Sequence, residues 1–96
     1  MEAIWYLYIL RCGDGSLYTG ITTDVQRRLA EHRSGKGAKY TRSRLSVELV
    51  YQEIVPDRSA ALRREAAIKK LSRQEKLRLV EQTEEPPATE KQKGSL

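Results

Sequence analysis

The sequence predicts one small mixed α+β domain with the element order β-β-α-β-α-α. Three observations support this prediction. The chain has 96 residues, which suffices for one domain with a single core. Two apolar segments joined by the turn signal CGDGS open the chain and predict a strand hairpin. After them, two stretches with helical spacing of apolar residues flank one further strand-like run.

The expected elements, in chain order, are strands at 4–11 and 17–21, a helix from 23 to 34, a strand at 47–55, and helices at 58–71 and 72–82. Thr23 with Gln26, and Ser72 with Glu75, resemble capping boxes at two helix starts. The segment 83–96 has no apolar pattern and contains two adjacent prolines. We therefore expect a domain over residues 1–82 and a disordered tail over 83–96.

The loop of the hairpin decides which strand residues share a face. A two-residue turn at Asp14-Gly15 would put Tyr8 and Tyr18 on opposite faces of the sheet. A three-residue loop over residues 13–15 would put both on one face, with Tyr8 opposite Gly20. We favour the three-residue loop because Gly15 suits its left-handed position and Gly20 would leave room beside the Tyr8 ring.

Charge is unevenly spread along the chain. Residues 1–80 contain 16 Lys and Arg against 9 Asp and Glu, and the stretch from Arg27 to Arg44 contains seven basic residues and one acid. Such a segment is typical of a polyanion-binding protein, although a solvated surface would have the same composition. No apolar run approaches the roughly 20 residues of a membrane helix, and the N-terminus lacks the charge pattern of a signal peptide. We therefore expect a cytoplasmic protein with no membrane partner.

Three charged or polar side chains fall on helix faces that should be apolar. Arg28 and His32 lie four residues apart beside the stripe of Val25 and Leu29. Glu65 lies among the apolar residues of the second predicted helix. A carboxylate there must be paired, bind a metal, or shift its pKa. Two interpretations stay open, namely a functional cluster and a Glu65–Arg28 salt bridge that only joins two helices.

Together with Tyr8 and Tyr18, these residues suggest phosphodiester hydrolysis. One carboxylate can hold one divalent cation, an arginine can neutralise charge on phosphoryl oxygens, and a tyrosine of lowered pKa can take a proton from water. The residues that other classes of enzyme require are missing, since the sequence has no phosphate loop of the GxxxxGK type, no CxxC pair and no second histidine for zinc. A thiol–imidazole pair of Cys12 and His32 is the remaining alternative.

The same residues resemble the motifs of the GIY-YIG nuclease superfamily. The sequence YLY at residues 6–8 stands in place of the first motif, and YTG at 18–20 matches the second. Arg28 and His32 follow at the family's spacing, and Glu65 matches its metal-binding glutamate. The sequence is most similar to the small stand-alone YhbQ-like branch of this superfamily.

The resemblance covers about residues 4–80 and implies a three-stranded antiparallel sheet flanked by helices. It also implies cleavage of DNA with one Mg²⁺ or Mn²⁺ ion and no small-molecule cofactor. Tyr8 or Tyr18 would be the general base, Arg28 would contact the phosphate, His32 would support proton transfer or phosphate contact, and Glu65 would hold the metal.

The chain departs from the family pattern in three places. Tyr6 replaces the glycine of the first motif, no asparagine follows the glutamate helix, and the lysine that some DNA-repair members carry after the second motif is missing. Since no DNA-recognition domain follows the last predicted helix, we expect low sequence specificity and a preference for a DNA structure.

The basic loop after the first helix is expected to contact the DNA backbone through Lys36, Lys39, Arg42 and Arg44, with a solvated loop as the alternative. Two other functions stay open beside the endonuclease. One is a nucleic-acid-binding module that has lost turnover, and the other is an accessory subunit that binds an acidic protein.

Overall fold

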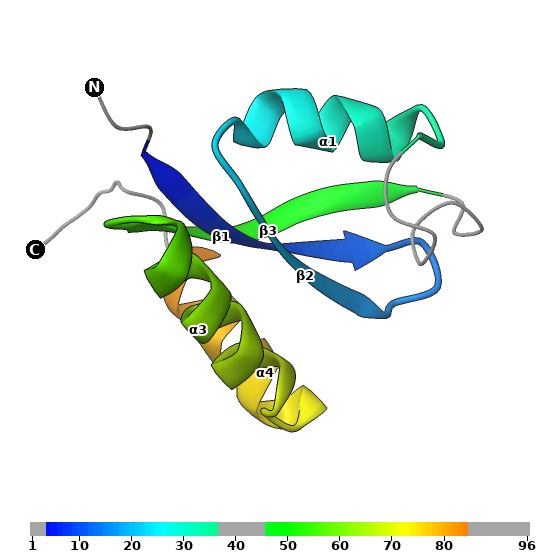
Figure 1. Cartoon of the computed structure of the whole chain (residues 1–96). Coiled ribbons are helices and arrows are strands. Elements are labelled where there is room, and N and C mark those ends of the chain that lie inside the picture. Colours follow the sequence, from blue (N-terminus) through cyan, green and yellow to red (C-terminus); the bar gives the residue numbers. More distant parts are fainter. Residues whose placement is uncertain (1–3, 37–45, 85–96) are drawn as a thin grey trace, which may run out of the picture.

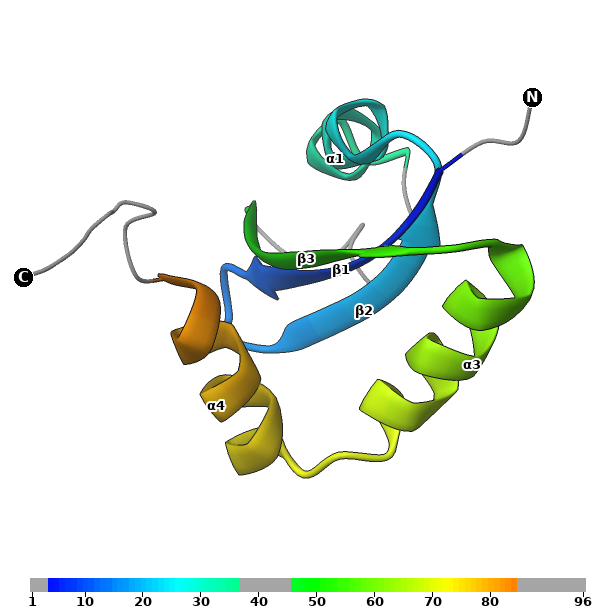
Figure 2. The ribbon, with the colours of Figure 1, turned by 90° about the vertical axis from the view of Figure 1, so that its left-hand side faces the viewer.

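A computed structural model describes residues 4–36 and 46–84 of the chain and contains one antiparallel sheet between two helical layers (Figures 1 and 2). Strand β1 (Trp5–Cys12) lies between β2 (Leu17–Thr22) and β3 (Val47–Val55). Helix α1 (Val25–Arg33) covers one face, and α3 (Arg58–Lys69) and α4 (Arg73–Glu84) cover the other. The predicted element order and the three-stranded antiparallel sheet are confirmed. No helix in these described ranges is long and apolar enough to cross a membrane.

The β1–β2 hairpin has the predicted three-residue loop. The Cys12 N–H donates to the Ser16 carbonyl at 2.8 Å, and Gly15 adopts φ +87°, the left-handed conformation that favours glycine. The resulting register places Tyr8 opposite Gly20 and Leu10 opposite Tyr18. Both tyrosines therefore lie on one face of the sheet.

Strand alternation divides the core into two layers. Leu7 and Ile9 point towards α3 and α4 and pack with Ile68 and Val80. The alternate residues of β1, which are Tyr8, Leu10 and Cys12, point towards α1. They form a second layer with Leu29 of α1 and Val47 of β3. The tyrosine face is thus the face that α1 covers.

The start of α1 differs from the prediction. Asp24, and not Thr23, is the N-cap, because its side chain accepts the Arg27 N–H at 3.0 Å. Strand β2 continues to Thr22, whose hydroxyl oxygen accepts the Asp24 N–H at 3.1 Å. This contact holds Asp24 in the extended conformation that an N-cap requires. The predicted capping box of Thr23 and Gln26 is therefore wrong.

Other helix boundaries follow the sequence closely. Gly35 ends α1 with φ +82°, and Ser72 and Glu75 exchange two hydrogen bonds of 2.9 and 3.1 Å in a capping box. Helix α3 ends two residues earlier than predicted and α4 ends two residues later. The remainder of the predicted tail, 85–96, lies outside the described residues.

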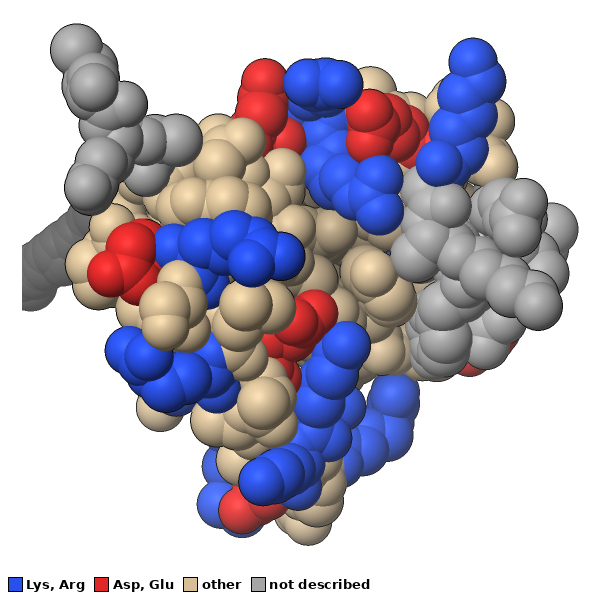
Figure 3. Space-filling view, in the orientation of Figure 1, with Lys and Arg blue, Asp and Glu red and all other residues tan. Residues whose placement is uncertain are grey.

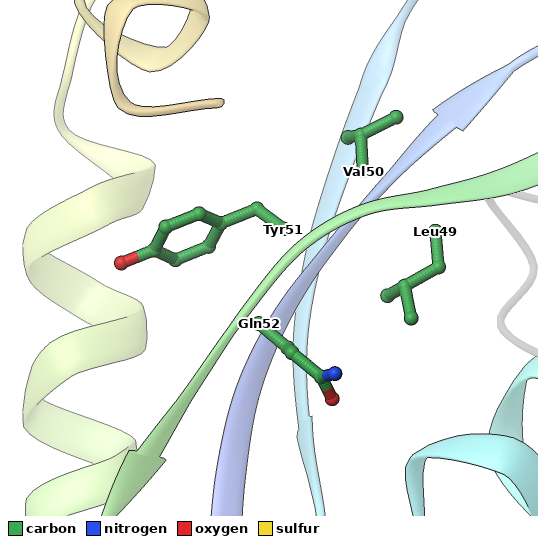
Figure 4. A pocket seen from close by; sticks show the side chains of 4 residues that line it. All are labelled: Leu49, Val50, Tyr51 and Gln52. Atoms are coloured by element: carbon green, nitrogen blue, oxygen red, sulfur yellow. The ribbon is translucent and has the colours of Figure 1, made fainter. Parts of the chain in front are cut away.

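Strand β3 carries a bulge that the sequence does not reveal. Its pairing with β1 shifts by one residue at Val50, so Val50 and Tyr51 both join the core on the α3 and α4 side. In Figure 4 their side chains point away from those of Leu49 and Gln52, which lie on the α1 side; these four residues line a shallow pocket. The bulge thereby brings Gln52 onto the tyrosine face, directly opposite Tyr8.

Candidate active site

Tyr8 on β1 and His32 on α1 meet in the layer between the sheet and α1. The Tyr8 Oη and His32 Nε2 atoms lie 3.0 Å apart, and each residue is only 2% exposed. His32 lies in the last turn of α1 on the stripe of Val25 and Leu29, so packing of that stripe directs its ring at the sheet. The hydrogen bond joins the two groups into one proton-exchanging unit.

Tyr18 completes a cluster of three rings. Its ring centroid lies 5.3 Å from that of His32 and 6.3 Å from that of Tyr8. The hairpin register causes this contact, because Tyr8 and Tyr18 are diagonal neighbours on one face of the strand pair. The cluster therefore joins β1, β2 and α1.

Gly20 provides the space in which the Tyr8 ring lies. A Cβ atom at position 20 would be 2.5 Å from Tyr8 Oη, 2.7 Å from Tyr8 Cζ and 3.1 Å from Tyr18 Cε2. The phenol of Tyr8 therefore crosses over the backbone of β2. The structure therefore shows the space beside the Tyr8 ring that the sequence predicted at Gly20.

Electrostatics link Arg28 and Glu65 to the same phenol. Burial raises the pKa of Tyr8 to about 12, the Arg28 guanidinium opposes this increase, and the negative charge of Glu65 adds to it. Burial, and then the Arg28 charge, lower the pKa of His32. At neutral pH the pair therefore consists of a neutral phenol and a neutral imidazole.

Arg28 lies on α1 beside the ring cluster, with its side chain partly exposed. Its Nη1 donates to Glu31 Oε1 at 2.8 Å, a contact between residues three apart on one helix. This contact is the main reason why the pKa of Arg28 is raised, and it fixes one side of the guanidinium. The guanidinium also acts on the Tyr8 phenol and lowers its pKa, so Arg28 lies between Glu31 and the ring cluster.

Glu65 reaches the site from the opposite face of the sheet. It belongs to α3, its side chain is 20% exposed, and its Oε2 lies 3.2 Å from Lys69 Nζ. Helix α3 packs against β2 and β1 on the face opposite α1 (Figure 2), and the Glu65 charge contributes to the raised pKa of Tyr8, so we take the β2 edge between α1 and α3 as the candidate site. Figure 3 shows this face, where basic side chains are intermingled with acidic ones and an area of uncharged atoms lies beside an acidic side chain near the centre. The alternative Glu65–Arg28 salt bridge is not formed, since each residue pairs within its own helix.

Glu65 is the carboxylate of α3 that could serve as a ligand to a divalent cation. In the parts of the chain that the structure describes, no group of three or more His, Cys, Asp or Glu side chains could hold a metal. A divalent ion would therefore take one oxygen ligand from Glu65 and the others from water and substrate, as Mg²⁺ and Mn²⁺ accept. Zinc, which requires three or four protein ligands, does not fit.

Of the residues predicted to contact the DNA backbone, Lys36 alone lies within the described residues. Lys36 is exposed just beyond α1, and Lys39, Arg42 and Arg44 lie outside the described residues. Cys12 is buried in the core layer beneath α1, and the Nε2 atom of His32 faces the Tyr8 Oη atom at 3.0 Å. The Cys12–His32 alternative therefore has no support.

Two partners at the site were missed in the sequence. Glu31 holds Arg28, and Lys69 holds Glu65. Spacings of three and four residues along a helix would have revealed both pairs. Gln52 was also missed, because only the bulge in β3 brings it opposite Tyr8.

Comparison with known proteins identifies relatives of the whole domain. The family model of the GIY-YIG catalytic domain matches residues 4–78. A UPF0213 protein of Streptococcus sanguinis is 58% identical over 82 residues, which cover 85% of this chain and 94% of that protein. A UPF0213 protein of Natronomonas pharaonis is also 58% identical, over 83% of this chain and 94% of that protein.

Two solved structures share the fold and much of the sequence. The solution NMR structure of the UPF0213 protein BH0048 from Bacillus halodurans is 50% identical, with a TM-score of 0.57 over 88% of this chain and 89% of that chain. The solution NMR structure of EF2693 from E. faecalis is 45% identical, with a TM-score of 0.58 over 88% and 92% of the two chains.

Proposed function

The chain belongs to the GIY-YIG family, and from this premise we propose that it is a small divalent-metal-dependent endonuclease that hydrolyses phosphodiester bonds in DNA. One observation carries the proposal. Tyr8, Tyr18 and His32 lie in contact above Gly20, and the charges of Arg28 and Glu65 act on the Tyr8 phenol. The net charge of +5 supports a polyanionic substrate.

The first chemical step is removal of a proton from the attacking water. With a pKa of about 12, Tyr8 is a phenol at neutral pH and cannot act alone as a phenolate base. In the tautomer of His32 whose Nε2 is unprotonated, the imidazole accepts the Tyr8 proton across the 3.0 Å hydrogen bond. Tyr8 takes the water proton as it gives up its own, so His32 ends as the imidazolium and no free phenolate forms.

The second step is attack at phosphorus. The water oxygen bonds to phosphorus, the bond to the leaving oxygen breaks, and that oxygen is finally protonated from solvent. The partly exposed Arg28 donates to the phosphoryl oxygens as their charge increases. A Mg²⁺ or Mn²⁺ ion held by the Glu65 carboxylate would supply polarisation of the phosphate and stabilisation of the leaving oxygen.

Nicking of supercoiled DNA tests this function. Purified full-length chain is incubated with the DNA and either Mg²⁺, Mn²⁺ or a chelator. We expect cleavage that needs the metal and is lost in Glu65→Gln and Arg28→Ala. The matched controls are Glu81→Gln and Arg63→Ala, exposed residues of α4 and α3 that lie outside the cluster.

The outcomes separate the three functions. If wild type and Glu65→Gln give equal background nicking while both bind DNA, the chain is a binding module and not a nuclease. If neither protein binds DNA at low salt, the accessory-subunit alternative gains. Comparison of Tyr8→Phe with Tyr18→Phe identifies the tyrosine of the relay, since only the Tyr8 oxygen contacts His32 Nε2 in our scheme.

A further inference from the structure

A second recessed surface adjoins the cluster on the same face of the sheet. Tyr6 and Gln52 together line two neighbouring depressions of about 300 and 360 Å³. Each volume equals that of about ten water molecules, which is ample for a planar ring system. The other residues along the two depressions are Thr23, Asp24, Val25, Gln26, Glu53 and Ile54. We call this surface the Tyr6–Gln52 pocket.

The strand register places the Tyr6–Gln52 pocket directly beside the catalytic tyrosine. Tyr6 is two residues before Tyr8 on β1 and therefore shares its face, about 7 Å away along the strand. Gln52 pairs with Tyr8 across β1 and β3, and Ile54 pairs with Tyr6. The pocket is lined by β1, β3 and the start of α1, whereas the Tyr8 phenol lies over β2, so a strand whose phosphate lies at the phenol would reach this pocket around the start of α1.

The chemistry of the pocket suits a base better than a phosphate. Tyr6 offers a partly exposed ring, Ile54 is 70% exposed beside it, and Gln52 offers an exposed amide that can donate and accept. The charged residues among the described lining, Asp24 and Glu53, are both acidic, and Glu53 is paired with Arg64 at 2.6 Å. The described lining therefore contains no basic residue to bind a phosphate, whereas an aromatic ring and an amide recognise the face and edge of a nucleobase.

We propose that the Tyr6–Gln52 pocket binds one unpaired nucleobase of the strand being cut, so that the substrate is DNA with single-stranded character beside the scissile phosphate. In a duplex, the base faces are stacked and the pairing edges are occupied, so a duplex base cannot enter without being extruded. Tyr6, the residue that replaces the glycine of the first motif, would supply the stacking ring. This inference rests on the proposed nuclease function.

Binding measurements test the pocket without cleavage. Fluorescence anisotropy on full-length chain carrying Glu65→Gln compares a short single-stranded DNA with the same sequence as a duplex. Adding Tyr6→Leu should weaken single-strand binding roughly 5-fold or more, as expected for loss of one stacked base, and leave duplex binding unchanged. Gln52→Ala, a substitution of an exposed residue, should act in the same direction. Leu62→Ala, at a 40% exposed residue of α3, is the control that should change neither.

Abasic nucleotides make the test specific. A single abasic site is placed at successive positions of the single strand, and for the Glu65→Gln protein one of these DNA positions should weaken binding. With Tyr6→Leu added, no DNA position should weaken binding further, because the missing base and the missing ring belong to the same contact. Equal loss on single strand and duplex, or an abasic effect that persists without Tyr6, would overturn the proposal.

Two further readouts separate this inference from its premise. If single-strand binding depends on Tyr6 but wild type never cleaves, the nuclease function fails and base binding remains. If wild type cleaves DNA, and Tyr6→Leu cleaves single-stranded and duplex DNA at the wild-type rates, the nuclease function stands and the base-binding role of the pocket is refuted. A change in sedimentation of Tyr6→Leu without a change in DNA affinity would make this surface a protein interface and would also refute base binding.

Discussion

Replacement of Gly20 by alanine tests how far the site depends on one missing methyl group. Gly20 lies in the interior of β2, and its φ angle is not positive, so alanine can adopt the same backbone conformation. The new Cβ would lie 2.5 Å from Tyr8 Oη and 2.7 Å from Cζ, closer than real Cβ contacts. We expect the Tyr8 ring to move and its hydrogen bond with His32 to break.

The size of the effect follows from two opposed contributions. Gly to Ala in a strand interior alone stabilises by roughly 0.5–1 kcal/mol, whereas overpacking costs about 1–3 kcal/mol. The net loss should be about 1 kcal/mol, which lowers the Tm of a domain this size by roughly 4–8 °C. DNA cleavage should fall much further, by the 10²- to 10⁴-fold or so that general base catalysis contributes.

Circular dichroism melting and the nicking assay measure these two effects on the same protein. The double variant Gly20→Ala with Tyr8→Leu provides the control, because removal of the ring removes the clash. Its stability loss should be smaller than the sum of the two single losses. If Gly20→Ala melts at or above the wild-type temperature and cleaves DNA normally, the ring does not lie where we place it and the relay through Tyr8 is refuted.

Three further predictions concern single side chains. Because the pKa of His32 is lowered in the folded chain, the unfolded chain binds more protons than the folded one below about pH 6.5. The Tm should therefore fall as the pH drops through that range. In melting curves from about pH 5 to 8, His32→Gln should show a weaker dependence of Tm on pH. The buried Thr19 hydroxyl has no hydrogen-bond partner among the described residues, so Thr19→Val should raise the free energy of unfolding by about 1 kcal/mol in denaturant titrations. Lys69→Met should tighten Mn²⁺ binding at Glu65 by about 1.4- to 5-fold in electron paramagnetic resonance titrations, and the neighbouring Lys70→Met should not.

The parts of the fold that depend on local chemistry could be predicted. The hairpin register follows from loop length and strand parity, so the sequence suffices to pair Tyr8 with Gly20. The start of α1 could not be fixed in this way. Thr23 and Asp24 are both good N-caps, and the choice depends on how far β2 extends beside β1, a long-range property.

Helical spacing and strand parity suffice to propose the residues of the candidate site but not their arrangement. Helical spacing placed Arg28 and His32 together on α1, whereas the contact of His32 with Tyr8 depends on how α1 crosses the sheet. Spacing also placed Glu65 on a packed face of its helix. It did not reveal that α1 and α3 lie on opposite faces of the sheet, so that Glu65 acts on Tyr8 from across β2.

This arrangement gives the edge strand β2 a particular part in the proposed chemistry. The proton-relay half of the site lies in the core layer beneath α1, and the cation-binding half extends from the α3 layer. Only an edge strand allows groups from both layers to meet, because a neighbouring strand would separate them. At that edge the absence of a side chain at position 20 lets the Tyr8 phenol lie over the backbone of β2. Gly20 therefore joins the two halves, which is why its replacement should disable cleavage while costing little stability.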